Sequence, residues 1–342
     1  MRLRSIVTGL LVAGILAPAT STLDKPAQAA AQSSASGIGI RLLEAPVAAR
    51  ADRRAWAYII DHLAPGSVIH RQVEVFNTTG SPKHLSIYTA AGEIRNQKFR
   101  FAAGRTANEL STWTTTDRHE VTLAPQGRSA VTATITVPED AAPGERYAMI
   151  WAEAAKAAPP DGGVAQVNRV GIRLYLSVGP GNPPASDFTI DSVTAQRSPN
   201  GQQSVLAQVH NTGGRALDLS GDLKLTSSSG SQYHSAGPYK IQTGTTLAPG
   251  DVGSIAAALT EQVSDGPWRA RIRLESGLTK RTAEATIRFP TAGAAQAVKA
   301  EMDTSYYPIA ALASGIVLAA LVAITFLLIQ RKRRSRRERS NA

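Results

Sequence analysis

Hydrophobic and polar residues alternate with a period of two through much of the chain between residues 37 and 290. Apolar side chains recur at every second position in 131–137, 172–178 and 268–274. Such alternation predicts β-strands with one buried and one solvent-facing side, usually in antiparallel sheets. No long amphipathic helix is expected there. Short strands separated by turns rich in Gly, Pro and Asn predict an all-β fold built from immunoglobulin-like β-sandwiches.

Two tandem sandwich domains are expected, at residues 37–180 and 187–290. Between them the sequence GPGNPP, at 179–184, contains two glycines and three prolines. Prolines lack a backbone donor and cannot continue a central strand, so residues 181–186 are interpreted as a semi-stiff linker.

The two predicted domains share short turn sequences. VEVFNTTG at 73–80 parallels AQVHNTGG at 207–214, and LAPQG at 123–127 parallels LAPGD at 247–251. Asn tolerates left-handed backbone and hydrogen-bonds nearby main chain, while Gly supplies positive φ. We interpret these segments as equivalent turns of two similar sandwiches.

The first 29 residues have the three parts of a secretory signal peptide. Arg2 and Arg4 precede an apolar run at 6–17, and Ala27-Gln28-Ala29 places small residues before a cleavage site. The apolar run is too short to span a bilayer comfortably, which disfavours an uncleaved anchor. Residues 30–36 are rich in Ala, Ser and Gln and are expected to be disordered.

A second apolar segment predicts a membrane anchor at residues 308–330. Residues 309–329 contain no charged side chain, and a helix of that length matches a bilayer core. A linker at 291–307 leads into it, and a basic tail at 331–342 follows it. Interfacial aromatics and basic residues, which stay on the cytoplasmic side, flank the span: Tyr306, Tyr307, Arg331, Lys332, Arg333 and Arg334. We therefore expect a single-pass protein of the cell membrane with an extracellular ectodomain, whose tail contacts the lipid bilayer.

The net charge of +11 does not indicate nucleic-acid binding, because most of it lies at the chain ends. Seven basic residues and one acidic residue at 331–339 supply +6, and the first 30 residues supply +2. A nucleic-acid-binding protein gathers its charge on a folded face. The chain also has no cysteine, which excludes disulfides, Cys-ligated zinc and a Cys nucleophile.

Catalytic and metal-binding motifs are missing from the sequence. The six histidines are scattered without metal-ligand spacing. His119 and Glu120 beside Asp117 form the one acidic group with a histidine, which we interpret as a solvated strand entry. No Gly-x-Ser-x-Gly nucleophile turn or phosphate-binding glycine loop occurs. We expect a protein that is not an enzyme and has no cofactor or metal.

Aromatic residues are the first candidates for a glycan-binding surface, because sugar rings stack on flat side chains. Trp151, Trp268 and Trp56 alternate with other apolar residues and are predicted to lie in the core. Trp113 differs, since it sits in the polar stretch 102–118. Loops carry binding residues more often than strands do, so Trp113 is a candidate ligand contact. The alternative is that it closes an open end of the sandwich.

Basic residues near the same stretch are further candidates for contacts with carboxylates or anionic wall polymers. These are Arg95, Lys98, Arg100 and Arg105. A solvated face is the competing interpretation. Arg269, Arg271 and Arg273 form a second basic stripe, which on an exposed face would also discourage edge aggregation.

The first predicted domain resembles the peptidoglycan-binding domain of the WxL-interacting proteins, formerly a domain of unknown function in Gram-positive bacteria. The resemblance covers residues 37–180 and the order of signal, two sandwiches, helix and basic tail. Its most specific segment is PEDAAPGERYAMIWAE at 138–153. Six segments carry it in order: GIGIRLLEA, WAYIID, VIHRQVEVFNTTG, HLSIYTAAGEI, LAPQGRSAVTATITVPEDAAPGERYAMIWAE and VGIRLYLSV.

The resemblance implies a non-catalytic surface protein that binds peptidoglycan or another wall polymer and docks secreted surface proteins to the cell wall. The second domain is similar to generic bacterial immunoglobulin-like modules. The alternative function is a protein–protein adaptor or chaperone-like module, in which an exposed sheet edge accepts a partner strand without glycan binding.

Overall fold

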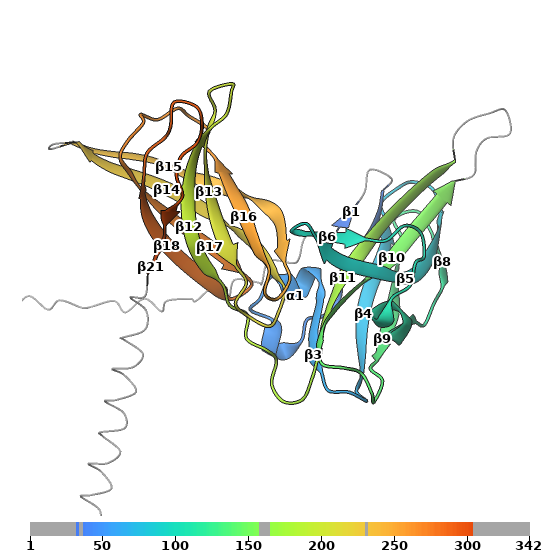
Figure 1. Ribbon diagram of the computed structural model, residues 1–342. Coiled ribbons are helices and arrows are strands. Elements are labelled where there is room, and N and C mark those ends of the chain that lie inside the picture. Colours follow the sequence, from blue (N-terminus) through green and yellow to red (C-terminus); the bar gives the residue numbers. More distant parts are fainter. Residues whose placement is uncertain (1–31, 34–36, 157–164, 230–231, 304–342) are drawn as a thin grey trace, which may run out of the picture.

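The computed structural model describes residues 32–33, 37–156, 165–229 and 232–303, which form two β-sandwiches (Figure 1). Within these described ranges, no helix has the length and apolar character needed to cross a bilayer. The expected signal peptide at 1–29, span at 308–330 and tail at 331–342 lie outside the described residues. The all-β fold expected from the alternating pattern is confirmed.

The first sandwich consists of two sheets. One sheet has, in order of neighbours, β1 (Gln32–Ser33), β2 (Ile38–Leu42), β4 (Val68–Asn77), β9 (Arg128–Thr136) and β7 (Thr114–Thr116). The other has β3 (Ile59–Leu63), β11 (Gln166–Val178), β10 (Gly144–Lys156), β5 (Lys83–Arg95) and β6 (Lys98–Phe101), with β8 (Glu120–Leu123) also on β5. Strand β3 runs parallel to β11, whereas the other paired strands are antiparallel.

The second sandwich also consists of two sheets. One has β16 (Val252–Ala258), β13 (Gln203–His210), β12 (Thr189–Arg197) and β19 (Gly293–Ala294), with β20 (Val298–Lys299) also on β12. The other has β15 (Gln232–Leu247), β14 (Leu217–Ser229), β17 (Trp268–Ser276), β18 (Thr279–Ile287) and β21 (Glu301–Met302).

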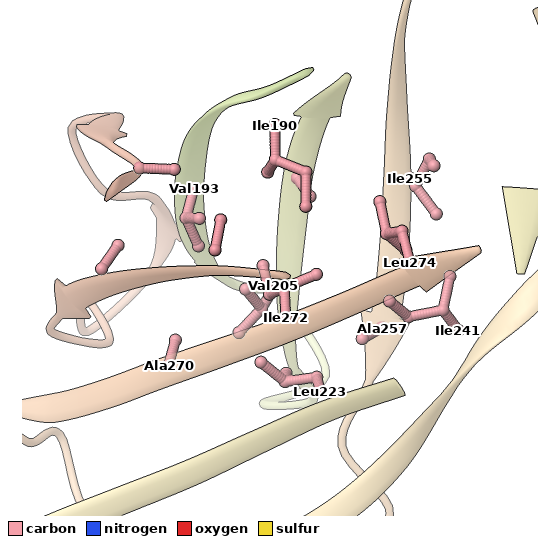
Figure 2. Close-up of a cluster of buried hydrophobic side chains, with 14 of the residues drawn as sticks. Ile190, Val193, Val205, Leu223, Ile241, Ile255, Ala257, Ala270, Ile272 and Leu274 are labelled. Carbon is pink, nitrogen blue, oxygen red and sulfur yellow. The ribbon is translucent and has the colours of Figure 1, made fainter. Parts of the chain in front are cut away.

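Each sandwich encloses its own apolar core, because alternate side chains of facing sheets point inward. In β17, Ala270, Ile272 and Leu274 are buried while the intervening arginines are exposed, as the alternation predicts. Figure 2 shows Ile272 beside Val205 of the opposite sheet, and all three β17 side chains belong to one buried cluster. Burying each large aliphatic side chain stabilises the fold by about 2 kcal/mol.

The turns shared by the two domains are equivalent in structure, as their sequences predict. The Asn77 side-chain amide donates hydrogen bonds to the carbonyls of Ser81 and Ala124, and Asn77 Oδ1 accepts from Thr79 N. Asn211 donates in the same way to three carbonyls and accepts from a glycine amide two residues later; its partners are Arg215, Leu247, Ala248 and Gly213. Both asparagines are buried, so each satisfies carbonyls that water does not reach.

Two predicted non-strand segments are more ordered than expected. Residues 102–118, expected as a loop, contain α2 (Glu109–Trp113) and β7. Asn108 and Ser111 cap α2 reciprocally, which stabilises this single turn. Residues 293–302, expected in the linker before the membrane, form β19, β20 and β21 on the second sandwich. Ala300 between them is buried, which explains why this segment joins the domain.

Three further expectations are wrong. Trp56 lies in the short helix α1 (Arg54–Ala57), which follows a 3₁₀ turn at Val47–Ala49, rather than in a core strand. Asp52 Oδ1 accepts a hydrogen bond from the Arg54 amide at the start of this helix. Gln32 and Ser33, expected to be disordered, pair with β2 as strand β1. In β11, Tyr175 and Ser177 were expected to face solvent, yet both are buried because further side chains cover that outer face.

Candidate functional site: the outer face and open edge of the β11 sheet

Aromatic side chains cover the outer face of the β11 sheet, on the side away from the core of the first sandwich. We call this group the aromatic layer; its buried members are Tyr88, Ala90, Phe99, Met149, Trp151, Tyr175 and, from the second sandwich, Ala216. In β10 the layer takes Met149 and Trp151, while Ile150 and Ala152 point into the core. Trp151 is buried, but in the aromatic layer and not in the sandwich core where the sequence predicted it.

Glycines in the sheet allow aromatic rings to lie directly on the backbone. A Cβ at Gly171 would come within 2.6 Å of Trp151 Cε3, and one at Gly92 within 2.7 Å of Phe99 Cζ. Any other residue at these positions would push the ring away. Trp151 consequently lies across β11, and its buried Nε1 has no hydrogen-bond partner among the described residues.

Three arginine side chains lie over the aromatic layer. Arg169 lies 4.5 Å from the ring centre of Trp151 and 5.2 Å from that of Phe101. Arg173 lies 4.7 Å from the Phe99 ring centre. The third, Arg105, lies 4.2 Å from the ring centre of Tyr88, whose hydroxyl donates to Glu153. A guanidinium over a ring is stabilised by the ring quadrupole, so the layer presents positive charge to its surroundings.

A cluster of charged groups joins the two sandwiches below the aromatic layer. Asp218, at the start of β14, lies 3.2 Å from Arg54 Nε and 3.5 Å from Arg173 Nη1. Its Oδ1 also accepts hydrogen bonds from the Tyr175 and Thr246 hydroxyls. Burial, and then the charge of Asp218, raise the pKa of Tyr175 far above its usual value, which keeps this hydroxyl a donor. The cluster ties both domains together.

A second carboxylate, Glu145 in β10, also reaches the second sandwich. Its Oε2 accepts hydrogen bonds from the Ala216 amide and the Tyr147 hydroxyl, both at 2.7 Å. Burial raises the pKa of Glu145, while these hydrogen bonds and the charge of Arg215 oppose the shift. Burial also lowers the pKa of Arg215.

The tip of the β5–β6 hairpin makes a third contact between the domains. Asn96 and Gln97 both have positive φ, as a two-residue hairpin turn requires. The Gln97 carbonyl accepts from Thr246 N at 2.8 Å, and its Oε1 accepts from Ser254 N at 3.2 Å. Beside this tip, a cavity of about 490 Å³ is lined by Lys98, Phe99, Arg173 and residues of β15 and β16.

The candidate residues from the sequence do not form one cluster. Register places Arg95, Lys98 and Arg100 on one face of the β5–β6 hairpin, opposite to Phe99 and Phe101. Arg95 is exposed beside Glu93, and Lys98 lines the interdomain cavity.

The other two candidates lie elsewhere. Arg105 covers Tyr88 on the outer face of the sheet. Trp113 ends α2, packs partly buried against the core, and lies under Arg146 at 4.9 Å. This placement favours the interpretation that Trp113 closes the end of the sandwich.

One edge of β11 lacks a strand neighbour over part of its length, among the described strands. Strand β3 pairs only with residues 174–178, whereas residues 166–173 pair with β10 alone among the described strands. We call Gln166–Arg173 the free edge of β11. Val167 within it is 57% exposed. Strand β1 lies nearby but pairs with β2 instead.

Backbone groups of odd-numbered residues point outward along this edge. The Gly179 amide donates to the Leu63 carbonyl of β3, so residue 179 faces away from β10. Backbone direction alternates along a strand. The amides and carbonyls of residues 167, 169 and 171 therefore also face away from β10, toward the side where these residues have no strand neighbour.

The sequence pattern did not indicate this edge. The edge exists because β3 pairs with only part of β11, and the sequence does not predict how far that pairing extends. The local signal for the aromatic layer was present, since Gly92 and Gly171 interrupt otherwise apolar strands.

A larger concave pocket, with a volume of about 1610 Å³, lies on the outer face of the second sandwich. Ion pairs cross it: Arg281 with Asp187 at 2.6 Å, Lys280 with Glu275 at 3.5 Å, and Arg271 with Asp303 at 3.4 Å. Three of its five cations therefore already have carboxylate partners, and the other two, Lys240 and Arg273, both stand opposite Asp222 in the strand register. This pocket is a weaker candidate for binding an anionic ligand.

No family model and no curated protein matches this sequence. Among solved structures, the YadV chaperone has a TM-score of 0.38 at 12% identity, covering 73% of this chain and 100% of that one. The CupB2 chaperone of Pseudomonas aeruginosa has 0.35 at 9% identity, covering 67% and 97%. A Salmonella enterica SafA pilin–SafB chaperone complex has 0.37 at 12% identity, covering 68% and 93%. Scores this low assign no function to the present chain.

Proposed function

We propose that this chain is a non-catalytic, membrane-anchored protein of the cell surface whose first sandwich binds an extended segment of a partner protein. The partner would pair with the free edge of β11 as an additional strand. The observation that carries the proposal is the row of outward-facing backbone groups at residues 167–171, which have no strand partner among the described residues. In this mode main-chain hydrogen bonds supply affinity and alternate side chains supply specificity.

The membrane anchor is proposed from the sequence pattern. The uncharged segment 309–329, followed by Arg331 and the basic tail, supports a single span with the ectodomain outside. The second sandwich continues to Asp303. Residues 304–308 could then extend at most about 20 Å, which would hold the second sandwich close to the bilayer.

A second candidate function is binding of peptidoglycan or an anionic wall polymer, as the resemblance to the WxL-interacting proteins implies. The side chains of Arg95, Lys98 and Arg100 on one face of the β5–β6 hairpin support it, because their cations could pair with carboxylates or phosphates. In that case the chain would dock surface proteins to the wall.

Photo-crosslinking in intact cells tests strand addition. A photoreactive residue at Val167 is expected to give specific protein adducts. Val167→Pro should abolish partner binding, because it removes an outward-facing donor without breaking the β10 ladder. Val167→Thr is the matched control, since it keeps the donor and a β-branched side chain. Equal partner recovery with both variants would refute the proposal.

Purified sacculi separate the two candidate functions. Retention of the wild-type chain that falls in a triple Arg95→Ser, Lys98→Ser, Arg100→Ser variant would support polymer binding. Retention no greater than that of an unrelated immunoglobulin-like domain would exclude it. The Val167→Pro variant should behave as wild type in this assay, because the edge and the hairpin are separate surfaces.

A further inference from the structure

The free edge of β11 presents a defined series of side chains to a strand added beside it. Residues that send their backbone groups outward also send their side chains to the outer face of the sheet. These residues are Val167, Arg169 and Gly171. A partner strand would lie about 4.8 Å away. Every second residue of that strand would stand opposite one of these three positions, with its side chain on the same outer face of the sheet.

Arg169 gives this series a positive charge. Its guanidinium lies over Trp151 and Phe101, yet no carboxylate oxygen of the described residues lies within 4.0 Å of it. Glu153 stands opposite it in the register but pairs with the Tyr88 hydroxyl. Arg173, the next arginine along β11, differs because it already pairs with Asp218. Among the described residues, Arg169 is therefore the edge cation without a carboxylate in direct contact: its side chain reaches the Tyr88 hydroxyl, which in turn donates to Glu153.

Gly171 forms an apolar notch next to Arg169. Trp151 and Met149 lean over it from β10, with ring and methyl atoms 2.6 and 2.8 Å from where a Cβ would be. Because Gly171 has no side chain, it places nothing between these two residues and a partner strand. A side chain opposite Gly171 would meet the edge of a tryptophan ring and a thioether, which suits an aliphatic group.

We infer that the partner strand carries an acidic residue opposite Arg169 and an aliphatic residue two positions away, opposite Gly171. This inference rests on the strand addition proposed above and specifies the chemistry of the partner. Directly opposed ions of opposite sign stabilise neighbouring strands, whereas like charges destabilise them. Arg105, which lies over Tyr88 on the same face, adds to the electrostatic repulsion of a basic partner.

Disulfide tethering on the full-length chain tests this inference, because the protein contains no cysteine. Val167→Cys is equilibrated in a thiol redox buffer with short β-forming peptides that carry one cysteine. Each peptide has Asp or Lys two residues from its cysteine and Leu four residues from it, in both chain directions. These spacings place the charge opposite Arg169 and the leucine opposite Gly171.

In one of the two chain directions, the Asp peptide is expected to be conjugated about fivefold more than the Lys peptide. This ratio is the effect expected when an attractive cross-strand ion pair is replaced by a repulsive one. Arg169→Glu should reverse this preference. Replacing the peptide leucine by Ser should reduce conjugation about threefold. Val252→Cys is the comparison site: it replaces an exposed valine on β16, where the Ser254 amide already donates to Gln97, and should show neither strand addition nor a charge preference.

The outcomes separate the two proposals. Greater conjugation at residue 167 than at residue 252, but without a charge preference that Arg169→Glu reverses, would overturn the inferred partner chemistry and leave strand addition intact. Equal conjugation at both sites for every peptide would overturn strand addition itself.

Discussion

Both sandwiches close their equivalent turns with a buried asparagine, yet they differ in what covers their outer faces. In the first, Trp151 and Tyr175 on the outer face of the β11 sheet are at most 5% exposed, because arginines and the second sandwich cover them. In the second, Arg269, Arg271 and Arg273 project from β17 into solvent. The shared turns therefore maintain the same fold in both sandwiches. The outer faces can differ in side chains because the packing of each inner core does not depend on its outer face.

The shared turns should show the largest effects on stability. Asn211→Ala removes an amide that satisfies three carbonyls, so we expect a loss of about 3 kcal/mol in the free energy of unfolding. Asn77→Ala removes two such bonds and should cost about 2 kcal/mol. Urea unfolding followed by tryptophan fluorescence measures both, since Trp151 and Trp268 report on different domains.

Asn200→Ala, in an exposed turn of the second sandwich, is the reference and should cost less than about 0.5 kcal/mol. If Asn77→Ala and Asn211→Ala cost no more stability than Asn200→Ala, the buried asparagines would not stabilise the two shared turns.

These turns could be predicted from sequence because their chemistry is local. An Asn followed by a Gly-containing turn specifies nearly the whole arrangement. The outer faces could not be predicted in the same way. Tyr175 alternates like a solvent-facing residue, and it is buried by the aromatic layer and Ala216 of the second sandwich. Ser177, in the same alternation, is buried beside His62 of β3.

The candidate site also depends on contacts between distant segments. The free edge of β11 exists because β3 reaches only residues 174–178, a parallel register that no local pattern encodes. Trp56 was predicted to lie in a core strand because the period-two pattern of its segment continues through α1, a helix of only four residues. Trp113 was a candidate because it lies in a polar stretch of the sequence. Its surroundings in the structure depend on α2 and on Arg146, which lies over its ring.

Charges between the domains provide the next test of the comparison. Asp218→Asn leaves Arg54 and Arg173 without a carboxylate, and we expect a loss of about 2 kcal/mol at this partly exposed site. Asp222→Asn, on the same strand but facing the open outer surface, should change stability by less than about 0.5 kcal/mol. Equal effects would mean that the domain contact does not depend on this charge cluster. Urea unfolding at neutral pH measures the difference.

Glu145 should give the smallest effect, and one that depends on pH. Burial raises the pKa of this carboxyl in the folded protein, so the folded state holds its proton more tightly than the unfolded state does. The stability that this group contributes is therefore present at pH values below its unfolded pKa. It is lost as the pH rises through the folded pKa.

Glu145→Gln keeps a neutral acceptor for the Ala216 amide but cannot titrate. Relative to the wild-type protein, this variant should become progressively more stable as the pH rises above the unfolded pKa of Glu145 and through its raised folded pKa. Urea unfolding across that range measures the difference, with Glu139→Gln, in the exposed turn before β10, as the reference. A constant difference, or one that moves in the other direction, would show that the folded protein does not favour the protonated Glu145. In that case Arg215 and the two hydrogen-bond donors would outweigh burial at this contact between the sandwiches.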